Sequence, residues 1–224
     1  MKKDPFNSLL VIVAAGVTAG IGGIFFWVPT DDFQGIVQRI FYVHVPSAWV
    51  AYLAFALVLV GSIAFLRTSN PRWDWLAHSS AEVGVVFTAV TLVTGMLWGR
   101  PVWGAYWVWD PRLTLTFVLF LIYLGYLAFR WMATDAGHGA RVAAVIGITG
   151  FATVPLVHFS VDWWRGQHPG RTVFKPESSP DLPPQMLVTM LFMLAMFTLL
   201  FALFLALRVR LARLDAAVSE MEAA

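Results

Sequence analysis

The chain has 224 residues, of which 59% are hydrophobic and only 12% are charged, and its formal net charge at pH 7 is +2. Soluble domains carry about 25% charged residues, so this composition indicates a membrane protein and carries no nucleic-acid signal. The chain has no cysteine, which excludes disulfides, thiolate metal ligands and attachment of a prosthetic group through a Cys-x-x-Cys-His motif.

Apolar runs long enough to cross a bilayer, which takes about 20 residues each, occur at 8–28, 46–66, 80–98, 113–131, 142–163 and 186–208. They predict an all-α polytopic membrane protein in which residues 1–224 form a single six-span domain. The first run ends at Trp27-Val-Pro29 without a small-residue cleavage site, so it is interpreted as a span and not as a signal peptide. Residues 209–224 are predicted to continue the last span as a charged helical tail.

The distribution of basic residues predicts the orientation, because six spans place both termini on one side. The segments on that side carry Lys2, Lys3, Arg67, Arg72, Arg130, Arg141, Arg208, Arg210 and Arg213. The other side carries Arg39, Arg100, Arg112, Arg165, Arg171 and Lys175. This modest excess predicts cytoplasmic termini, with the first, third and fifth loops on the outer face.

The first outer loop has apolar residues at helical spacing, with Gln34 and Gln38 on the opposite side: Phe33, Ile36, Val37, Ile40 and Phe41. This pattern predicts a short amphipathic helix in the membrane interface before the second span. The helix is expected to stop near Val45, because the residue before a proline disfavours helical geometry. Pro46 then suits the first turn of the second span, so His44 is predicted to lie at a break between two helices.

The third outer loop, predicted over 98–114, contains Trp98, Trp103, Tyr106, Trp107 and Trp109, with Arg100, Asp110 and Arg112 interleaved. Interfacial anchoring explains two or three such rings, but not this density of rings beside fixed charges. The segment favours a platform for a large, flat, partly anionic ligand. Its residues 103 and 107 would stack on one side only if the stretch is helical. Most tryptophans fall near this face, namely residues 27, 49, 98, 103, 107, 109, 163 and 164.

His44 and His158 flank this platform on the predicted outer face. A lone interfacial histidine is more often structural, but two on one face favour ligation of a metal. Pro155 is expected to bend the fifth span just before His158. Asp162 lies one turn after His158, where its carboxylate either accepts the other ring N–H or faces water.

The remaining polar candidates have simpler interpretations. Asp110-Pro111 fits a helix N-cap followed by proline at the first helical position, which we favour over a direct ligand role. His168, in the outer loop 164–185, either contacts a ligand or is solvated. Two inner histidines, His78 and His138, are expected to face solvent, and Glu82 is expected to lie shallow enough to reach the interface.

The chain also resembles a known family. Its segments 38–46 (QRIFYVHVP), 94–104 (TGMLWGRPVWG), 103–114 (WGAYWVWDPRLT) and 157–164 (VHFSVDWW) are similar to those of the CcmC (haem exporter protein C) family. The third of these looks like the tryptophan-rich WWD signature of haem-handling proteins of c-type cytochrome maturation. The match covers all six spans; one departure is Pro111, which fits the helix start.

This resemblance implies a haem-binding and transfer subunit, not an enzyme, in the CcmABCD complex of the bacterial inner membrane. Haem b would bind at the outer, periplasmic face and pass to the chaperone CcmE; CcmA would hydrolyse ATP, and CcmB and CcmD would be membrane partners. The flanking histidines of the family correspond to His44 and His158 as axial ligands of the iron. Other expected haem contacts are Trp98, Arg100, Trp103, Tyr106, Trp107, Trp109, Asp110, Arg112, Trp163, Trp164 and His168. Propionates favour arginine donors, and the candidates are Arg100, Arg112, Arg165 and Arg171.

Three other functions predict different sequence features. A membrane cytochrome b holds haem with histidines inside the spans, and no histidine falls mid-span here. A permease for another solute predicts ionisable residues near the bilayer midplane, which these spans largely lack. A haem lyase of the same superfamily, acting directly on apocytochrome, is generally longer and has more spans.

Overall fold

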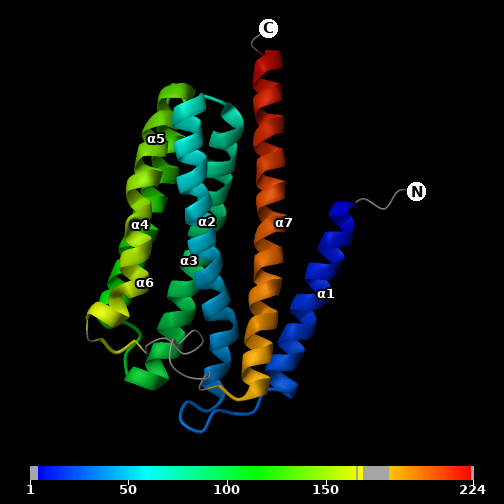
Figure 1. Ribbon diagram of the computed structural model, residues 1–224, viewed down its shortest axis with the longest axis vertical. Coiled ribbons are helices and arrows are strands. Elements are labelled where there is room, and N and C mark those ends of the chain that lie inside the picture. The colour runs from blue at the N-terminus through cyan, green and yellow to red at the C-terminus, as the bar shows by residue number, and fades with distance from the viewer. Residues whose placement is uncertain (1–4, 165, 169–181, 223–224) are drawn as a thin grey trace.

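The computed structural model describes residues 5–164, 166–168 and 182–222, and its long regular elements there are all helices (Figure 1). They are α1 (Pro5–Phe26), the 3₁₀ helix η1 (Ile36–Ile40), α2 (Phe41–Thr68), α3 (Pro71–Trp103), α4 (Pro111–Met132), α5 (Ala136–Phe151), α6 (Thr153–Trp163) and α7 (Pro184–Glu222). Within the described part of the chain, six helical stretches are long and apolar enough to cross a membrane. The predicted six-span, all-α architecture is therefore confirmed, as is the helical continuation of the last span beyond Arg208.

Helices α2 to α6 form a bundle, α7 runs beside it, and α1 lies outside α7 (Figure 1). We call the end where α3 leads into α4 the tryptophan end, and the end where α2 leads into α3 the opposite end. In Figure 1 the tryptophan end is at the bottom. The connectors at the opposite end are short: α2 and α3 are joined by Ser69 and Asn70 alone.

The start of α2 differs from the prediction. Since η1 leads directly into α2 at Phe41, the predicted break at His44 and the predicted span start at Pro46 are wrong. Pro46 removes a single N–H, the one that would bond the carbonyl of Tyr42, and the helix tolerates this loss near its start. Gln38, predicted on a polar face, is instead buried, and its Nε2 donates to the Tyr42 hydroxyl at 3.3 Å.

Helix α3 is longer than predicted at both ends. It begins at Pro71, where the side chain of Asn70 caps it by accepting from the Arg72 amide at 3.0 Å. It continues through Pro101 to Trp103, so the predicted loop 98–114 is irregular only over 104–110. The helix stops at Gly104, whose φ of 79° is a left-handed conformation that glycine adopts without strain.

Small residues bring α2 and α3 into close contact along their length. A Cβ on Gly61 would lie 2.9 Å from the Trp73 carbonyl oxygen, and one on Gly84 would lie 2.7 Å from the Phe55 ring. Lipid tails are as apolar as the side chains, so helices in a bilayer associate by such tight packing. The α2–α3 pair is the centre of the buried core, with Ala54 and other fully buried residues at its interface.

The outermost helix, α1, packs mainly on α7. Gly16 and Gly20 face the thioethers of Met196 and Met193, where an added Cβ would lie 2.2 and 2.3 Å from the sulfur atoms. The other side of α1 is exposed and apolar, as a lipid-facing surface is expected to be.

The fifth span was predicted to bend at Pro155, just before His158, and the helix is interrupted near this proline. It is divided into α5 and α6 at Ala152, three residues before Pro155. Proline has no N–H for the carbonyl of Phe151, four residues earlier, and its ring crowds that carbonyl. Helix α6, which carries His158, therefore has its own start.

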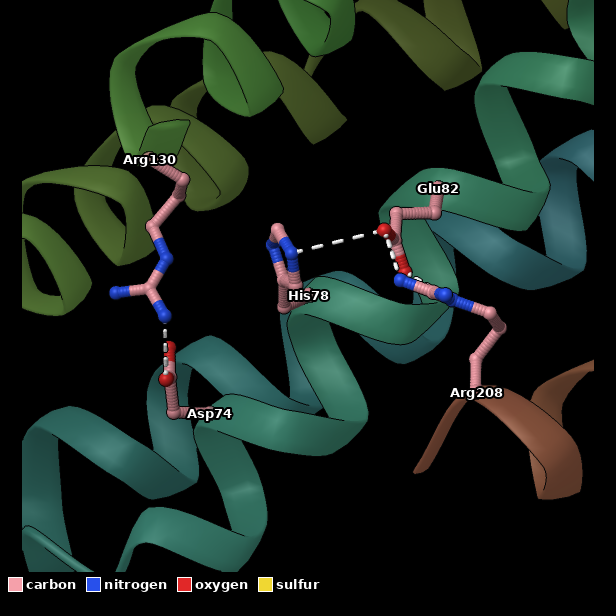
Figure 2. Close-up of polar contacts among 5 residues, drawn as sticks. All are labelled: Asp74, His78, Glu82, Arg130 and Arg208. Atoms are coloured by element: carbon pink, nitrogen blue, oxygen red, sulfur yellow. Dashed lines mark hydrogen bonds and ion pairs between the residues drawn. The ribbon is translucent and has the colours of Figure 1, made fainter. Parts of the chain in front are cut away.

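Charged side chains link three helices at the opposite end (Figure 2). Arg130 of α4 pairs with Asp74 of α3 at 2.9 Å, and both side chains are largely buried, with exposures of 18% and 12%. Arg208 of α7 donates to Glu82 of α3 from both Nε, at 2.7 Å, and Nη2. His78 lies between the two pairs, with its Nε2 3.8 Å from a Glu82 oxygen. Helix α3 is thus tied to both α4 and α7.

The expectation that His78 faces solvent is wrong, because its ring stacks on Tyr126 and its Nδ1 is buried. The local sequence gave no sign of this contact, since Tyr126 belongs to another span. His138 is exposed, as expected.

We expect Arg130→Met to destabilise the fold by about 3–5 kcal/mol, because it leaves the Asp74 carboxylate buried without its counter-charge. The measurement is the thermal unfolding midpoint in detergent. Adding Asp74→Asn should recover part of the loss. Arg141→Met, an exposed arginine at the same end, is the control; equal midpoints for Arg130→Met and Arg141→Met would contradict the prediction.

Candidate functional site

The residues predicted to form a site all lie at the tryptophan end, on several elements. Helix α2 carries His44, α4 carries Arg112, and α6 carries His158 and Trp163, followed by Trp164. The final turns of α3 carry Trp98, Arg100 and Trp103. The rest lie in irregular segments: Tyr106, Trp107, Trp109 and Asp110 in 104–110, and His168 in 166–168. Arg165 and Arg171 lie outside the described residues.

His44 is held against the face of α3. Its Nδ1 lies 3.0 Å from the hydroxyl oxygen of Thr94, and its ring meets the Trp98 ring edge-on at 5.7 Å. Gly95 allows this approach, because a Cβ there would lie 3.1 Å from the imidazole Cε1. The Trp98 indole N–H in turn donates to Gln34 at 2.7 Å. The role of Thr94 and Gly95 was missed, although both stand in the segment 94–104.

His158 is exposed, but its ring points toward α2. It makes edge-to-face contacts with Tyr52 of α2, at 6.3 Å, and with its neighbour Phe159, at 5.0 Å. Tyr52 was not predicted as part of a site, and its separation from His158 in sequence leaves no local signal. The two alternatives for Asp162, accepting from the ring of His158 or facing water, both stay predictions.

Arg112 connects three elements through its guanidinium. Its Nη2 donates to the backbone carbonyl of His158 at 3.2 Å, and its Nη1 lies 3.3 Å from Nδ1 of His168. The His168 ring also lies 6.4 Å from the ring of Trp103. Helix α4, helix α6 and segment 166–168 are thereby held together around one side chain.

Asp110 is a helix cap, as predicted, and it has a second role. One carboxylate oxygen accepts from the Arg112 amide at 2.8 Å, which caps α4 with Pro111 at its first position. The other oxygen accepts from the amides of Gln167, at 2.8 Å, and His168, at 3.3 Å. A Cβ on Gly166 would lie 2.0 Å from this oxygen, so the carboxylate fits tightly under the segment.

The rings of segment 104–110 are not stacked along one helix. Stacking of Trp103 and Trp107 on one side was predicted only if the stretch between them is helical, and α3 ends at Trp103. The Trp107 ring instead meets the rings of Trp109 and Phe117 edge-on, with centroids 5.6 and 5.8 Å apart. Trp109 is 78% exposed. The indole N–H of Trp107 is buried and has no hydrogen-bond partner among the described residues.

Three more exposed rings lie at the tryptophan end: Tyr106, in the same segment, and Trp163 and Trp164, at the end of α6. Tyr106 lies beneath the guanidinium of Arg100, which also donates to the Gly104 carbonyl. Trp163 stacks on Phe159, with 5.5 Å between centroids, and Trp164 packs edge-on against Trp163. A surface hollow of about 410 Å³ is lined by Val108, Trp109, Asp110, Pro111, Gly166 and Gln167.

Comparison with known proteins identifies the family. Residues 3–224 match the family described as CcmC, heme exporter protein C. The chain belongs to the heme exporter protein C family. The heme exporter protein C of Bradyrhizobium diazoefficiens is 40% identical over 170 residues, which cover 76% of this chain and 64% of that protein, just under two thirds of its length. The proteins of the same name from Haemophilus influenzae and Escherichia coli are 36% and 34% identical, over 85% and 76% of this chain and 76% and 68% of their own lengths.

Membership of this family confirms the resemblance seen in the sequence. It implies a part in haem transport during cytochrome c biogenesis. With six helices among its described residues that can span a membrane, the chain is a multi-pass membrane protein of this family.

Asp110 variants separate its two roles. Asp110→Asn keeps an oxygen for the α4 cap but places an amide NH₂ against the Gln167 amide, so we expect faster hydrogen exchange in 166–168 with α4 intact. Asp110→Ala loses the cap as well, at a further cost of about 0.5–2 kcal/mol. Asp135→Ala removes the corresponding cap of α5, where Asp135 accepts from the His138 amide, and is the control. Unchanged exchange in 166–168 for both Asp110 variants would contradict the second role.

Proposed function

We propose that the tryptophan end binds haem b between His44 and His158, with their imidazoles as axial ligands, and delivers it to the haem chaperone CcmE. The observation that carries the proposal is that two histidines from different helices, α2 and α6, lie at one end of the bundle, with the His158 ring turned toward Tyr52 of α2. Neutral imidazole is a standard protein ligand of haem iron. Family membership supports haem as the cargo.

The aromatic residues at this end suit a porphyrin. The exposed rings of Trp109, Trp163 and Trp164 offer flat faces for stacking. The hollow beside Trp109, at about 410 Å³, is within the usual size range of small-molecule sites. The buried indole N–H of Trp107 is costly without a partner, and a propionate oxygen would satisfy it.

Two described arginines are candidates for the propionates. Arg112 uses two of its terminal nitrogens on His158 and His168, but a guanidinium has five N–H donors, so others remain for a carboxylate. Arg100 is exposed above Tyr106. In this proposal Arg112 both fixes the backbone of His158 and contributes positive charge beside the haem.

The proposed setting is the CcmABCD complex of the bacterial inner membrane. The ATPase CcmA and the membrane subunits CcmB and CcmD would be its partners, and ATP hydrolysis would belong to CcmA. The orientation rests on the basic residues at the opposite end, among them Arg67, Arg72 and Arg141, which favour a cytoplasmic location for that end. The tryptophan end would then face the periplasm.

His44→Ala and His158→Ala are each expected to lower haem affinity by roughly tenfold or more, since altering groups behind a metal ligand already costs 10–100-fold. The protein is purified from cells supplied with haem, and the Soret band and haem titration are measured. His138→Ala, an exposed histidine at the opposite end, is the control. A wild type without a Soret band, or histidine variants with the wild-type spectrum and affinity, would overturn the proposal.

Trp107→Phe tests the proposed propionate donor, because it keeps an aromatic ring and removes the N–H. We expect haem affinity to fall about tenfold, since a hydrogen bond to a charged group contributes about 1.5 kcal/mol. The haem-free protein should be as stable as wild type or more stable, because a buried donor without a partner is removed. Trp131→Phe, an exposed ring at the opposite end, is the control. Reduced stability with unchanged affinity would mean that the N–H serves the protein alone.

A further inference from the structure

The contact between Thr94 and His44 contains information about where a proton lies. The Thr94 hydroxyl oxygen is 2.7 Å from the carbonyl oxygen of Val90 and 3.2 Å from that of Thr91, both on its own helix. The same oxygen is 3.0 Å from Nδ1 of His44, on α2. Three potential acceptor atoms therefore surround one hydroxyl group.

A hydroxyl has a single proton to donate. Two oxygen atoms 2.7 Å apart need a proton between them, since this distance is typical of an O–H···O hydrogen bond and is repulsive without one. The carbonyl of Val90 has no proton, so the Thr94 hydroxyl donates to it. Toward His44 the same oxygen then presents a lone pair, and the 3.0 Å contact is favourable only if Nδ1 of the imidazole carries the hydrogen.

We infer that Thr94 is a positioning residue that holds neutral His44 in its Nδ1–H tautomer and so leaves Nε2 as the ligating nitrogen. A neutral imidazole carries one ring proton, and the hydrogen bond made by one nitrogen decides which nitrogen is free to bind a metal. The backbone carbonyl of Thr91, also on α3, accepts a hydrogen bond from the same imidazole. The inference rests on the proposed function for its consequence in haem binding, but the tautomer itself does not.

The ring orientation is fixed by the same stretch of α3. Gly95 lies under the imidazole, where a Cβ would be 3.1 Å from Cε1 and 3.7 Å from Nδ1, and Trp98 meets the ring edge-on. The imidazole edge that holds Nδ1 and Cε1 therefore faces α3. Thr94, Gly95 and Trp98 act together as the support of one ligand.

The experiment compares three variants. Thr94→Val replaces the hydroxyl with a methyl group of similar size, and Thr94→Ser retains the hydroxyl. Thr91→Val is the matched control, because Thr91 lies one turn earlier on α3 and its hydroxyl bonds only the Phe87 carbonyl of its own helix. Haem affinity and the Soret spectrum are measured for each protein in detergent. In the haem-free proteins, ¹⁵N chemical shifts of labelled histidine report the tautomer, and His44→Ala assigns the signal.

In the haem-free wild type and Thr94→Ser we expect a protonated Nδ1 and an unprotonated Nε2 at His44, and in Thr94→Val a mixture of tautomers. Haem affinity should fall 10–100-fold in Thr94→Val, recover in Thr94→Ser and remain at wild type in Thr91→Val. An Nε2–H tautomer in the wild type overturns the inference, as does full haem affinity in Thr94→Val while His44→Ala loses it. If His44→Ala itself leaves haem affinity unchanged, the proposed function fails, and the histidine shifts still decide the tautomer.

Discussion

The close packing of α2 against α3 is the contact on which the rest of the molecule depends. Ala54 of α2 contacts Gly84 of α3. His44 lies as many residues before Ala54 as Thr94 lies after Gly84, and His44 contacts Thr94. The register that seats small residues in the core is therefore the register that seats His44 on Thr94. A large side chain at Gly84 would separate the helices and displace His44 from Thr94, although no residue at the tryptophan end is substituted.

The irregular backbone at the tryptophan end is stabilised by Asp110, which caps α4, and by Arg112 in the first turn of α4. Non-helical segments near a bilayer need internal partners for their polar groups. Asp110 supplies acceptors for the amides at 167 and 168, and Arg112 supplies donors to the carbonyl of His158 and to the ring of His168. Asp110 and Arg112, on either side of Pro111, therefore hold segment 166–168 and helix α6 in place. At His168 the carboxylate binds the backbone amide and the guanidinium binds the ring.

Local physical rules predicted much of this structure. Hydropathy gave the six spans, Asp110-Pro111 gave the start of α4, and a proline gave the interruption before α6. The same rules failed at Pro46 and Pro101, through which α2 and α3 continue. Each proline removes one N–H close to a helix end, and the helix tolerates this loss. The contacts of Thr94 and Tyr52 with histidines join residues 50 and more positions apart. Helical periodicity describes one helix at a time, so it cannot show which residue of a distant helix meets it.

The two histidines are held by different parts of the fold. His44 is half-buried, and its position follows from the α2–α3 register that the whole core maintains. His158 is exposed on an eleven-residue helix that is separated from α5 at Ala152, and Arg112 ties its backbone to α4. Helix α6 also reaches the buried core, through Val154 and Val157, so His158 is tied to that core by its own helix and His44 is tied to it through α3.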